Sequence, residues 1–539
     1  MRLRRKHYIL RLSIAATAVT LLTAGCANTN GNGNDGVVAV SDLGDLEDGI
    51  VNADPATGEP EDGGTLTFAA YAEPASLDPA KTIASATTGG IEMVNIYDSI
   101  MRYDAETGTI VPQLAEDLTS DPDFRTWTLT IPDNVTFSDG TLMDASAVKY
   151  SQQRYSESEG PESGLWNANV ASIETPTQHT IIYTLNKPWP NFPSILTSGP
   201  GMIVAKSAGP VDGDFTPIGA GPFSLAKWQQ GTSMTLSARE DYWGGPPSLD
   251  AIEIAYMPTT QVSMDTFNND EVDMTLAREP DDVAFMLEHG IAGFASTTNA
   301  TNITMINASP GRPGADQRVR KAMQLAIDPG LISKRTYGME AIGSNQLFAE
   351  ASKWNTSTDG PSYDPEQAKR LVAEAKADGF DGHIVSVFGP SQAKQKQALS
   401  TEAMLEAVGF NVETKILPTF SDQIRLVAAE RNYDLSDWGL SIRDPNPLSK
   451  MAAAMTSEGS QTYGMYTSKK MDSLIEKFQT TSGDKTKREL MSNIQMQVNR
   501  DVPFLVNGSF PEYVGWQQNV HGIKGTSNSM VLLGEAWKA

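Results

Sequence analysis

The sequence predicts an α/β protein that divides into two or more lobes. The chain has 539 residues, which is more than one hydrophobic core supports, so at least two cores are expected. After about residue 300, β-prone runs alternate with stretches of helical periodicity, and this order of elements is typical of α/β folds. The apolar share of 40% and the charged share of 20% are ordinary for a globular chain.

Runs rich in β-branched and alternating residues predict the strands. Apolar and polar residues alternate at 127–131 and 180–185, which is the pattern of a half-buried strand. The first of these runs ends in a Pro-Asp-Asn turn. Strands are expected at residues 65–71, 127–131, 135–137, 180–185, 233–238 and 251–257.

Apolar residues at helical spacing predict helices at residues 317–327, 365–377, 394–407 and 469–478. Pro365 stands at the first position of its helix, where its missing N–H costs nothing. Gly409 follows the third helix as a C-cap. The start signal at Pro365 and the end signal at Gly409 therefore agree with the helices that the apolar spacing predicts.

The N-terminus has the composition of an export signal. Residues 1–11 are basic, residues 12–24 are apolar or small, and Gly25-Cys26 follows. The apolar stretch is too short to span a membrane, which takes about 20 residues. Cys26 is the one cysteine of the chain, so no intrachain disulfide can form. An ordinary signal peptide that happens to contain a cysteine is the alternative interpretation.

The residues around Cys26, Leu22-Thr23-Ala24-Gly25-Cys26, resemble a bacterial lipobox, although Thr23 stands where leucine is usual. The resemblance implies a signal peptide over residues 1–25 and lipidation of Cys26. Residues 26–62 are rich in Asn, Gly and acids, and no Lys or Arg occurs between Arg11 and Lys81. Such a segment has few apolar residues to offset ordering entropy, so it is expected to be a disordered acidic tether.

Charge and motif content exclude several functions. The net charge of −25 repels nucleic acid and anionic lipid head groups, so neither is an expected partner. The histidines beyond the signal segment are scattered, and no HExxH, GxSxG or P-loop string occurs. Ser146 and Lys149 form an SxxK string, but its partner motifs are missing. The sequence therefore predicts no enzyme, no metal site and no cofactor.

Several strings, in order along nearly the whole chain from Gly63, resemble signatures of the family 5 extracellular solute-binding proteins. This family includes the oligopeptide-, dipeptide- and nickel-binding proteins of ABC importers. Two of the strings are WTLTIPDNVTFSDGTLMDASAVKYS and PIGAGPFSLAKWQQGTSMTLSAREDYW. The matching strings are residues 63–80, 95–117, 127–151, 217–243, 317–328 and 363–376.

The resemblance implies an α/β, two-lobed periplasmic-binding-protein-like fold (type II, large peptide-binding subclass) with a discontinuous first lobe and a hinge. Lobe I would comprise residues 63–301, with an extra subdomain at about 106–214, and a return segment at 506–539. Lobe II would comprise residues 302–505. Two strands, near 300–306 and 502–508, would cross between the lobes, and ligand would close the cleft between them.

The family's ligand-contacting segments carry over onto three stretches of this chain. They are the loop before the "LDP" string, a tyrosine in the following helix, and a segment of the form "gW..D…DP". Trp438 would cover or stack on a ligand, although a tryptophan of the core is an equal alternative. The implied ligand-binding residues are Glu73, Pro74, Ala75, Ser76, Tyr150, Trp438, Gly439, Leu440, Ser441, Ile442, Arg443, Asp444 and Pro445.

Ser441 stands where peptide binders of the family usually place an aspartate that pairs with the peptide's α-ammonium. Asp437, Asp444 or Glu73 would have to supply that charge, or the ligand lacks a free amine. Arg443 is a candidate contact for an anionic group. We expect Ser441→Asp to raise the affinity for peptides with a free amine.

The resemblance implies an exported substrate-binding lipoprotein on the outer face of the plasma membrane. It would be a monomer that captures a peptide or peptide-like solute and delivers it to an ABC permease and ATPase complex, touching the membrane through its N-terminal lipid only. An oligosaccharide or another solute without a free amine is the first alternative. A ligand-sensing lipoprotein is the second, and an exported enzyme is the least favoured.

Overall fold

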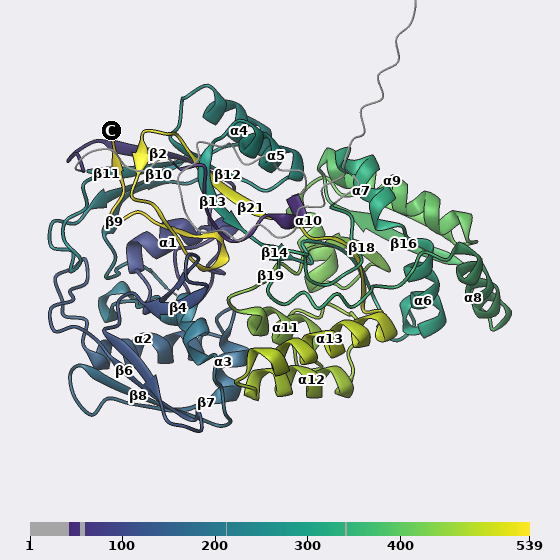
Figure 1. The fold of residues 1–539 in the computed structure, drawn as a ribbon, viewed down its shortest axis with the longest axis horizontal. Coiled ribbons are helices and arrows are strands. Elements are labelled where there is room, and N and C mark those ends of the chain that lie inside the picture. The colour runs from purple at the N-terminus through teal and green to yellow at the C-terminus, as the bar shows by residue number, and fades with distance from the viewer. Residues whose placement is uncertain (1–42, 54–59, 212, 340–341) are drawn as a thin grey trace, which may run out of the picture. The chain divides into compact units, whose positions relative to one another are not determined.

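The computed structural model describes residues 43–53, 60–211, 213–339 and 342–539. The main sheets of this part of the chain are two large ones and a smaller one. All of them belong to one compact unit of the chain. In Figure 1 the largest sheet lies on the left, and α6, α8 and α9 lie on the right beside β16 and β18.

The largest sheet has eight strands in the order β1-β13-β21-β12-β2-β11-β10-β9. Strand β21 comes from the C-terminal part of the chain, yet it lies antiparallel between β12 and β13. The sheet is therefore completed by a return segment. Its strands are β1 (Gly49–Val51), β13 (Ala292–Ser296), β21 (Glu512–Trp516), β12 (Met274–Ala277), β2 (Thr65–Ala70), β11 (Ala251–Tyr256), β10 (Ser233–Ala238) and β9 (Phe223–Gln229).

Successive side chains of β2 point to opposite faces of this sheet, and both faces are buried. Phe68 belongs to the core that includes α1 (Gly90–Tyr97), whereas Ala69 belongs to the core that includes α4 (Thr260–Asn268) and α5 (Pro280–Glu288). A strand buried on both faces reads as a nearly continuous apolar run, which is why residues 65–71 predict a strand so clearly.

The second large sheet has five strands in the order β17-β16-β18-β15-β20. They are β17 (Asn411–Ile416), β16 (His383–Phe388), β18 (Leu435–Trp438), β15 (Asn302–Ile306) and β20 (Phe504–Gly508). The helices α6 (Gln317–Ala326), α7 (Pro329–Tyr337), α8 (Pro365–Ala377) and α9 (Gln392–Ala407) accompany it. Helix α8 begins at Pro365 as expected, because the Asp364 side chain accepts a hydrogen bond from the backbone N–H of Gln367.

The smaller sheet has the order β5-β6-β8-β7 and lies with α2 and α3. Its elements are β5 (Asp117–Ser120), β6 (Thr126–Thr130), α2 (Ala145–Glu157), α3 (Ser163–Asn169), β7 (Val170–Glu174) and β8 (Thr180–Leu185). Aromatic rings fill its core; Tyr183 and Phe192, for example, lie 5.1 Å apart between centroids. Residues 135–137, expected as a strand, contribute a single bridge at Thr136.

Helix α3 contacts α11 (Pro447–Met455), and α12 (Lys469–Thr480) contacts the end of α3 and the segment after β8. Helix α13 (Asp484–Asp501) packs on α12. Gln479 on α12 donates a 2.6 Å hydrogen bond to Asn169 at the end of α3. Lys187 forms a 2.8 Å ion pair with Glu476 on α12. Segments far apart in the sequence therefore meet at this side of the molecule.

Short elements connect the sheets. The strands are β3 (Met101–Asp104), β4 (Thr109–Pro112), β14 (Thr298–Asn299), β19 (Ile442–Arg443), β22 (Val520–His521), β23 (Lys524–Gly525), β24 (Val531–Leu532) and β25 (Trp537–Lys538). The helical turns are η1 (Leu43–Asp45), η2 (Ala86–Thr88), η3 (Phe192–Thr197), η4 (Gly199–Gly201), η5 (Lys206–Ala208), η6 (Pro313–Ala315), α10 (Phe420–Ile424), η7 (Arg425–Ala429) and η8 (Ser527–Ser529).

Two neighbouring segments join the large sheets. The chain passes from β13 through β14 to β15, and it returns from β20 to β21. The Ala300 N–H donates a 2.8 Å hydrogen bond to the Ser509 hydroxyl, so the outgoing and returning segments contact each other. Ala300 has a φ of 49°, a conformation that is unfavourable for a residue with a Cβ. Two adjacent connections of this kind are suited to hinge bending.

The prediction of a disordered tether is wrong for residues 43–53. Strand β1 pairs with β13 at the edge of the eight-stranded sheet. Leu43 is buried, and the Thr297 N–H donates a hydrogen bond to the Asp48 carboxylate. The composition of residues 26–62 does not indicate this short strand, because its hydrogen-bond partners come from the edge of the sheet and not from the segment itself.

The predicted signal peptide, Cys26 and residues 27–42 and 54–59 of the predicted tether lie outside the described residues. Within the described ranges, no helix combines the length and the apolar character that crossing a membrane requires.

Candidate functional site

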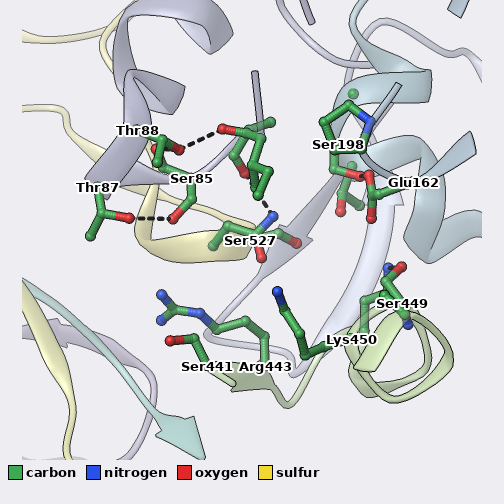
Figure 2. A pocket seen from close by; sticks show the side chains of 18 of the residues that line it. Ser85, Thr87, Thr88, Glu162, Ser198, Ser441, Arg443, Ser449, Lys450 and Ser527 are labelled. Carbon is green, nitrogen blue, oxygen red and sulfur yellow. Dashed lines mark hydrogen bonds between the residues drawn. The ribbon is translucent and has the colours of Figure 1, made fainter. Parts of the chain in front are cut away.

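The candidate site is a pocket between segments that accompany the two large sheets (Figure 2). It encloses about 1060 Å³ of space free of protein atoms, part of it open to solvent. The side that continues from the first sheet contributes Thr82, Ile83, Ala84, Ser85, Thr87, Thr88, Tyr155, Pro161, Glu162, Thr197, Ser198, Gly199, Ser527 and Asn528. The other side contributes Gly439, Leu440, Ser441, Arg443, Pro445, Asn446, Ser449, Lys450, Ala453 and Gln461.

One wall is the loop before α1, which local hydrogen bonds hold in shape. The hydroxyls of Ser85 and Thr87 lie 3.2 Å apart, and Thr88 Oγ1 donates to the carbonyl of Ile83 at 2.6 Å. Gly90 allows this turn, because a Cβ there would lie 2.5 Å from the backbone nitrogen of Ser85. The loop therefore presents fixed polar groups to the pocket (Figure 2).

The opposite wall begins with the turn between β18 and β19. Gly439 lets this turn lie close to the segment between β14 and β15, because a Cβ at position 439 would lie 2.8 Å from the Thr301 carbonyl oxygen. Ser441 has a φ of 54°, and the following residue Ile442 pairs with Asn299 of β14. This turn thus fixes the Ser441 side chain at the pocket, next to the connection between the sheets.

Helix α11 continues this wall. Pro447 occupies its first turn, and the Asn446 side chain accepts a hydrogen bond from the Ser449 N–H, so the sequence Asn-Pro starts the helix. The start of the helix places Ser449 and Lys450 at the pocket. In Figure 2 the Lys450 side chain rises between Arg443 and Ser449, and its ammonium faces Ser527.

Two arginines share one buried carboxylate beside this pocket. Glu512 Oε2 accepts from Arg443 Nη2 at 2.5 Å, and Glu512 Oε1 accepts from Arg278 Nε at 2.9 Å. Burial alone would raise the pKa of Glu512, but the two guanidinium groups outweigh it and lower that pKa to about 2. Arg278 Nη2 also lies 3.5 Å from the Ser441 hydroxyl. The group therefore carries a net positive charge next to Ser441.

Glu162 is the acidic side chain among the lining residues. Its Oε2 accepts a hydrogen bond from the Ser198 hydroxyl. Burial raises the pKa of Glu162, while hydrogen bonds from Ser198 and Ser449 and the charge of Lys450 act in the opposite direction. Burial also lowers the pKa of Lys450 to about 8.

The structure places the segment Glu73–Ser76 away from this pocket. Glu73 Oε1 accepts from the Trp228 indole at 2.8 Å and from the Gly231 N–H at 2.9 Å, so its carboxylate holds the β9–β10 hairpin. Pro74 is buried, and Ala75 and Ser76 line a separate depression with residues 213–217 and 225–230. Tyr150 on α2 is half-buried with the Lys206 ammonium 5.9 Å from its ring, and it lies outside the lining.

Several members of the predicted segment 438–445 support the pocket without lining it. Trp438 is half-buried and packs edge-on against Tyr463 at 5.7 Å between centroids. Ile442 is buried. Asp444 accepts hydrogen bonds from Asn299, from the Ser352 hydroxyl and from the Lys353 N–H. From the predicted segment, Gly439, Leu440, Ser441, Arg443 and Pro445 line the pocket; which of them contact a solute stays a prediction.

Sequence reasoning missed Glu162, Lys450 and Ser527. Glu162 follows a Gly-Pro turn and carries no motif. For Lys450 the sequence offered one signal, the Asn446-Pro447 start of the helix that carries it. Ser527 belongs to the C-terminal return segment, and its place at the pocket depends on pairing between strands that are remote in sequence. Among the residues that the structure describes, no cluster of three or more His, Cys, Asp or Glu side chains is arranged to hold a metal ion.

Solved structures identify the fold. The oligopeptide-binding protein AppA of Bacillus subtilis, in complex with a nonapeptide, superposes with a TM-score of 0.75 at 19% identity, covering 89% of this chain and 100% of that chain. AgaA in complex with agropinic acid superposes with a TM-score of 0.75 at 20% identity, covering 88% and 99%. The fold is therefore the two-lobed α/β fold of the peptide-binding class of solute-binding proteins, which confirms the predicted fold class.

The chain belongs to the bacterial extracellular solute-binding proteins, family 5, whose model matches residues 109–462. The dipeptide-binding protein of Escherichia coli (strain K12) is 22% identical over 82% of this chain and 88% of its own length. The probable di/tripeptide-binding protein 5 of Pseudomonas aeruginosa (strain UCBPP-PA14) is 22% identical over 86% and 94%. The predicted family is confirmed, and as its member the chain is a binding protein and not an enzyme.

Proposed function

We propose that this chain is the lipid-anchored receptor of an ABC importer, which captures a peptide or peptide-like solute in the pocket and delivers it to a membrane permease. The observation that carries the proposal is the composition of the pocket wall. Segments 82–88 and 527–528 come from the side of the eight-stranded sheet, whereas 439–461 comes from the side of the five-stranded sheet. A solute that touches both sides favours the closed arrangement over an open one.

Two further features support capture by closure. The connections between the sheets are adjacent and contain the backbone strain at Ala300. The ion pair between Lys187 and Glu476 on α12, which also joins the two sides, is exposed to solvent. This ion pair breaks at low cost, because exposed ion pairs contribute about 0–1 kcal/mol.

The test is a thermal-shift screen of the purified chain after unfolding and refolding have removed any carried ligand. The panel contains di- to pentapeptides with a free amine, N-blocked and cyclic peptides, oligosaccharides, haem and nickel. A solute at 100 times its dissociation constant adds about 2.7 kcal/mol of stability. We expect a shift from a peptide or a peptide-like compound; a response to haem or nickel alone would refute the proposed solute class.

A variant with a filled pocket makes the test specific to this site. Ala453 lines the pocket, so Ala453→Phe is expected to remove the ligand-induced shift. Ala373 on α8 is exposed and distant from the lining residues, so Ala373→Phe is the matched control that keeps the shift. An unchanged response in Ala453→Phe would place the binding site elsewhere.

A further inference from the structure

The Lys450 ammonium has hydrogen-bonding capacity that the protein leaves unused. Its Nζ donates to Gln461 Oε1 at 2.9 Å, and an ammonium has three donors. In the described part of the chain, no carboxylate lies within ion-pair distance of it, and Glu162 of the same lining attracts it from farther away; Lys450 is half-buried and lines the pocket. A lysine in such surroundings is costly unless a partner of opposite charge arrives.

Ser527 is a second unused donor at the same pocket. The residue is 3% exposed, and its Oγ has no hydrogen-bond partner among the described residues. The neighbouring Asn528 donates a 2.8 Å hydrogen bond to the Ala84 carbonyl, which holds this turn against the loop before α1. A buried polar atom without a partner is rare in native proteins, and here it lies in the lining, facing Lys450 in Figure 2.

The charges around these donors favour an anion. The three acids that sequence reasoning offered as partners for an ammonium are engaged elsewhere: Glu73 holds the β9–β10 hairpin, Asp444 accepts three hydrogen bonds, and Asp437 accepts from Gly389 and Gln423. The N-terminus of α11 adds partial positive charge near Lys450.

The two arginines beside the wall point the same way. Arg443 and Arg278 share the single carboxylate of Glu512. Glu162, the acid among the lining residues, acts against an anion when it is charged; the Ser198 hydroxyl donates to it, and burial raises its pKa, which favours its neutral form. The pocket therefore offers unsatisfied donors to a solute and no free carboxylate at the position of Ser441.

We propose that the pocket recognises a carboxylate of its solute, through the Lys450 ammonium and the Ser527 hydroxyl, in place of recognising a free α-ammonium. The inference rests on the proposed function, since it names the solute class of the same pocket. Two sources supply this chemistry: the C-terminus of a peptide whose amine is blocked or cyclised, and a non-peptide acid such as a sugar acid. Both present a planar anion that accepts from two donors.

Matched compounds test the proposal on the refolded full chain. One pair is N-acetyl-Ala-Ala and its C-terminal amide, and the other is gluconate and glucose; cyclic and longer N-acetylated peptides extend the first pair. We expect the acids to bind and their neutral partners to bind at least roughly tenfold more weakly, because a hydrogen bond to a charged group carries that difference. The pair that responds identifies the source of the carboxylate.

Variants connect the effect to the two donors. Lys450→Met is expected to lower the affinity for the responding acid at least roughly tenfold and to change the affinity for the neutral partner far less; Lys450→Gln repeats the test with a polar side chain. Ser527→Ala is expected to lower it severalfold. Lys396 is exposed on α9, so Lys396→Met changes the same charge away from the pocket and keeps wild-type affinity.

The following results would overturn the proposal. Equal binding of acid and neutral partner overturns the carboxylate inference and leaves the proposed function standing. Preferential binding of free-amine peptide amides that is lost in Glu162→Gln also overturns it, since an ammonium would then be the recognised group. Silence from every compound, including the peptide panel, overturns the inference together with the proposed function.

Discussion

Arg443 Nη2 lies 2.5 Å from Oε2 of Glu512, so the arginine expected to contact an anionic ligand already has a carboxylate of its own chain. Both side chains are buried, with 7% and 1% of their surface exposed. Arg278 approaches the other oxygen of Glu512 at 2.9 Å. This shared carboxylate holds β19 of the pocket wall to β21 of the eight-stranded sheet.

Replacing Glu512 by glutamine should destabilise the protein strongly. The variant leaves Arg443 buried without a counter-charge, which costs about 3–5 kcal/mol in comparable pairs. Urea denaturation followed by circular dichroism measures the difference. Glu535→Gln is the control, because Glu535 pairs with Lys524 at the surface and should change stability by less than about 1 kcal/mol. Equal losses in the two variants would refute the importance of burial.

The Glu512 effect should depend on pH in a definite direction. The pKa of Glu512 is lowered from 4.5 to about 2. A lowered carboxyl pKa contributes stability that is complete above the unfolded pKa and is lost as the pH falls through the folded pKa. The stability gap between wild type and Glu512→Gln should therefore be constant above about pH 5 and shrink by roughly 3 kcal/mol towards pH 2. A gap that grows in acid would contradict the assignment.

Lys450→Met should stabilise the protein when no ligand is bound. Burial lowers the pKa of Lys450 from 10.5 to about 8, so the charged form is disfavoured in the folded state; Glu162 opposes this shift and Arg443 adds to it. We expect a gain of about 1 kcal/mol at pH 7. The gain should fade as the pH rises from about 8 to 10.5, because the folded lysine then loses its charge. Lys396→Met should change stability little, and a similar gain there would exclude the pocket as the cause.

Much of the fold follows from local pattern. Residues 365–377 form α8 as predicted, because the apolar spacing and the Asp364-Pro365 start agree. Strand β1 was missed because its stability comes from its partner β13 and not from its own composition. Local patterns therefore specify helices and central strands better than they specify an edge strand.

Only the part of the candidate site that belongs to a family motif could be predicted from the sequence. The motif that ends in Asp444-Pro445 predicted Gly439, Ser441 and Arg443, and these three residues line the pocket. The same motif also named Asp444, whose carboxylate the protein uses internally. Ser527 comes close only because β21 inserts between β12 and β13, a long-range pairing that no local signal in the sequence encodes.

Cys26 is expected to anchor the chain. Cys26→Ser removes the one residue that a lipoprotein pathway can acylate, so the protein should leave the membrane fraction and the detergent phase. Detergent-phase partitioning and the mass of the N-terminal peptide measure the change. Asn28→Ser alters the neighbouring tether and should keep the wild-type distribution. Retention of Cys26→Ser in the membrane fraction would remove lipidation from the proposed function.

Ser441→Asp tests why this pocket differs from one that binds an ammonium. The sequence alone predicts that the new carboxylate raises the affinity for free-amine peptides. The structure changes this expectation, because Arg278 Nη2 lies 3.5 Å from the Ser441 hydroxyl and would pair with the carboxylate first. Aspartate tolerates the left-handed backbone of this position, where φ is 54°, so the variant should fold.

The double variant Ser441→Asp with Arg278→Gln should therefore succeed where the single variant fails. Removing Arg278 leaves Glu512 paired with Arg443 in a balanced ion pair, and the carboxylate at position 441 is then free to accept from a peptide ammonium. We expect the single variant to gain little and the double variant to gain at least roughly tenfold for free-amine dipeptides, measured by calorimetry. A full gain in Ser441→Asp alone would show that Arg278 does not control this position. No gain in either variant would show that a carboxylate at position 441 does not bind a peptide ammonium in this pocket.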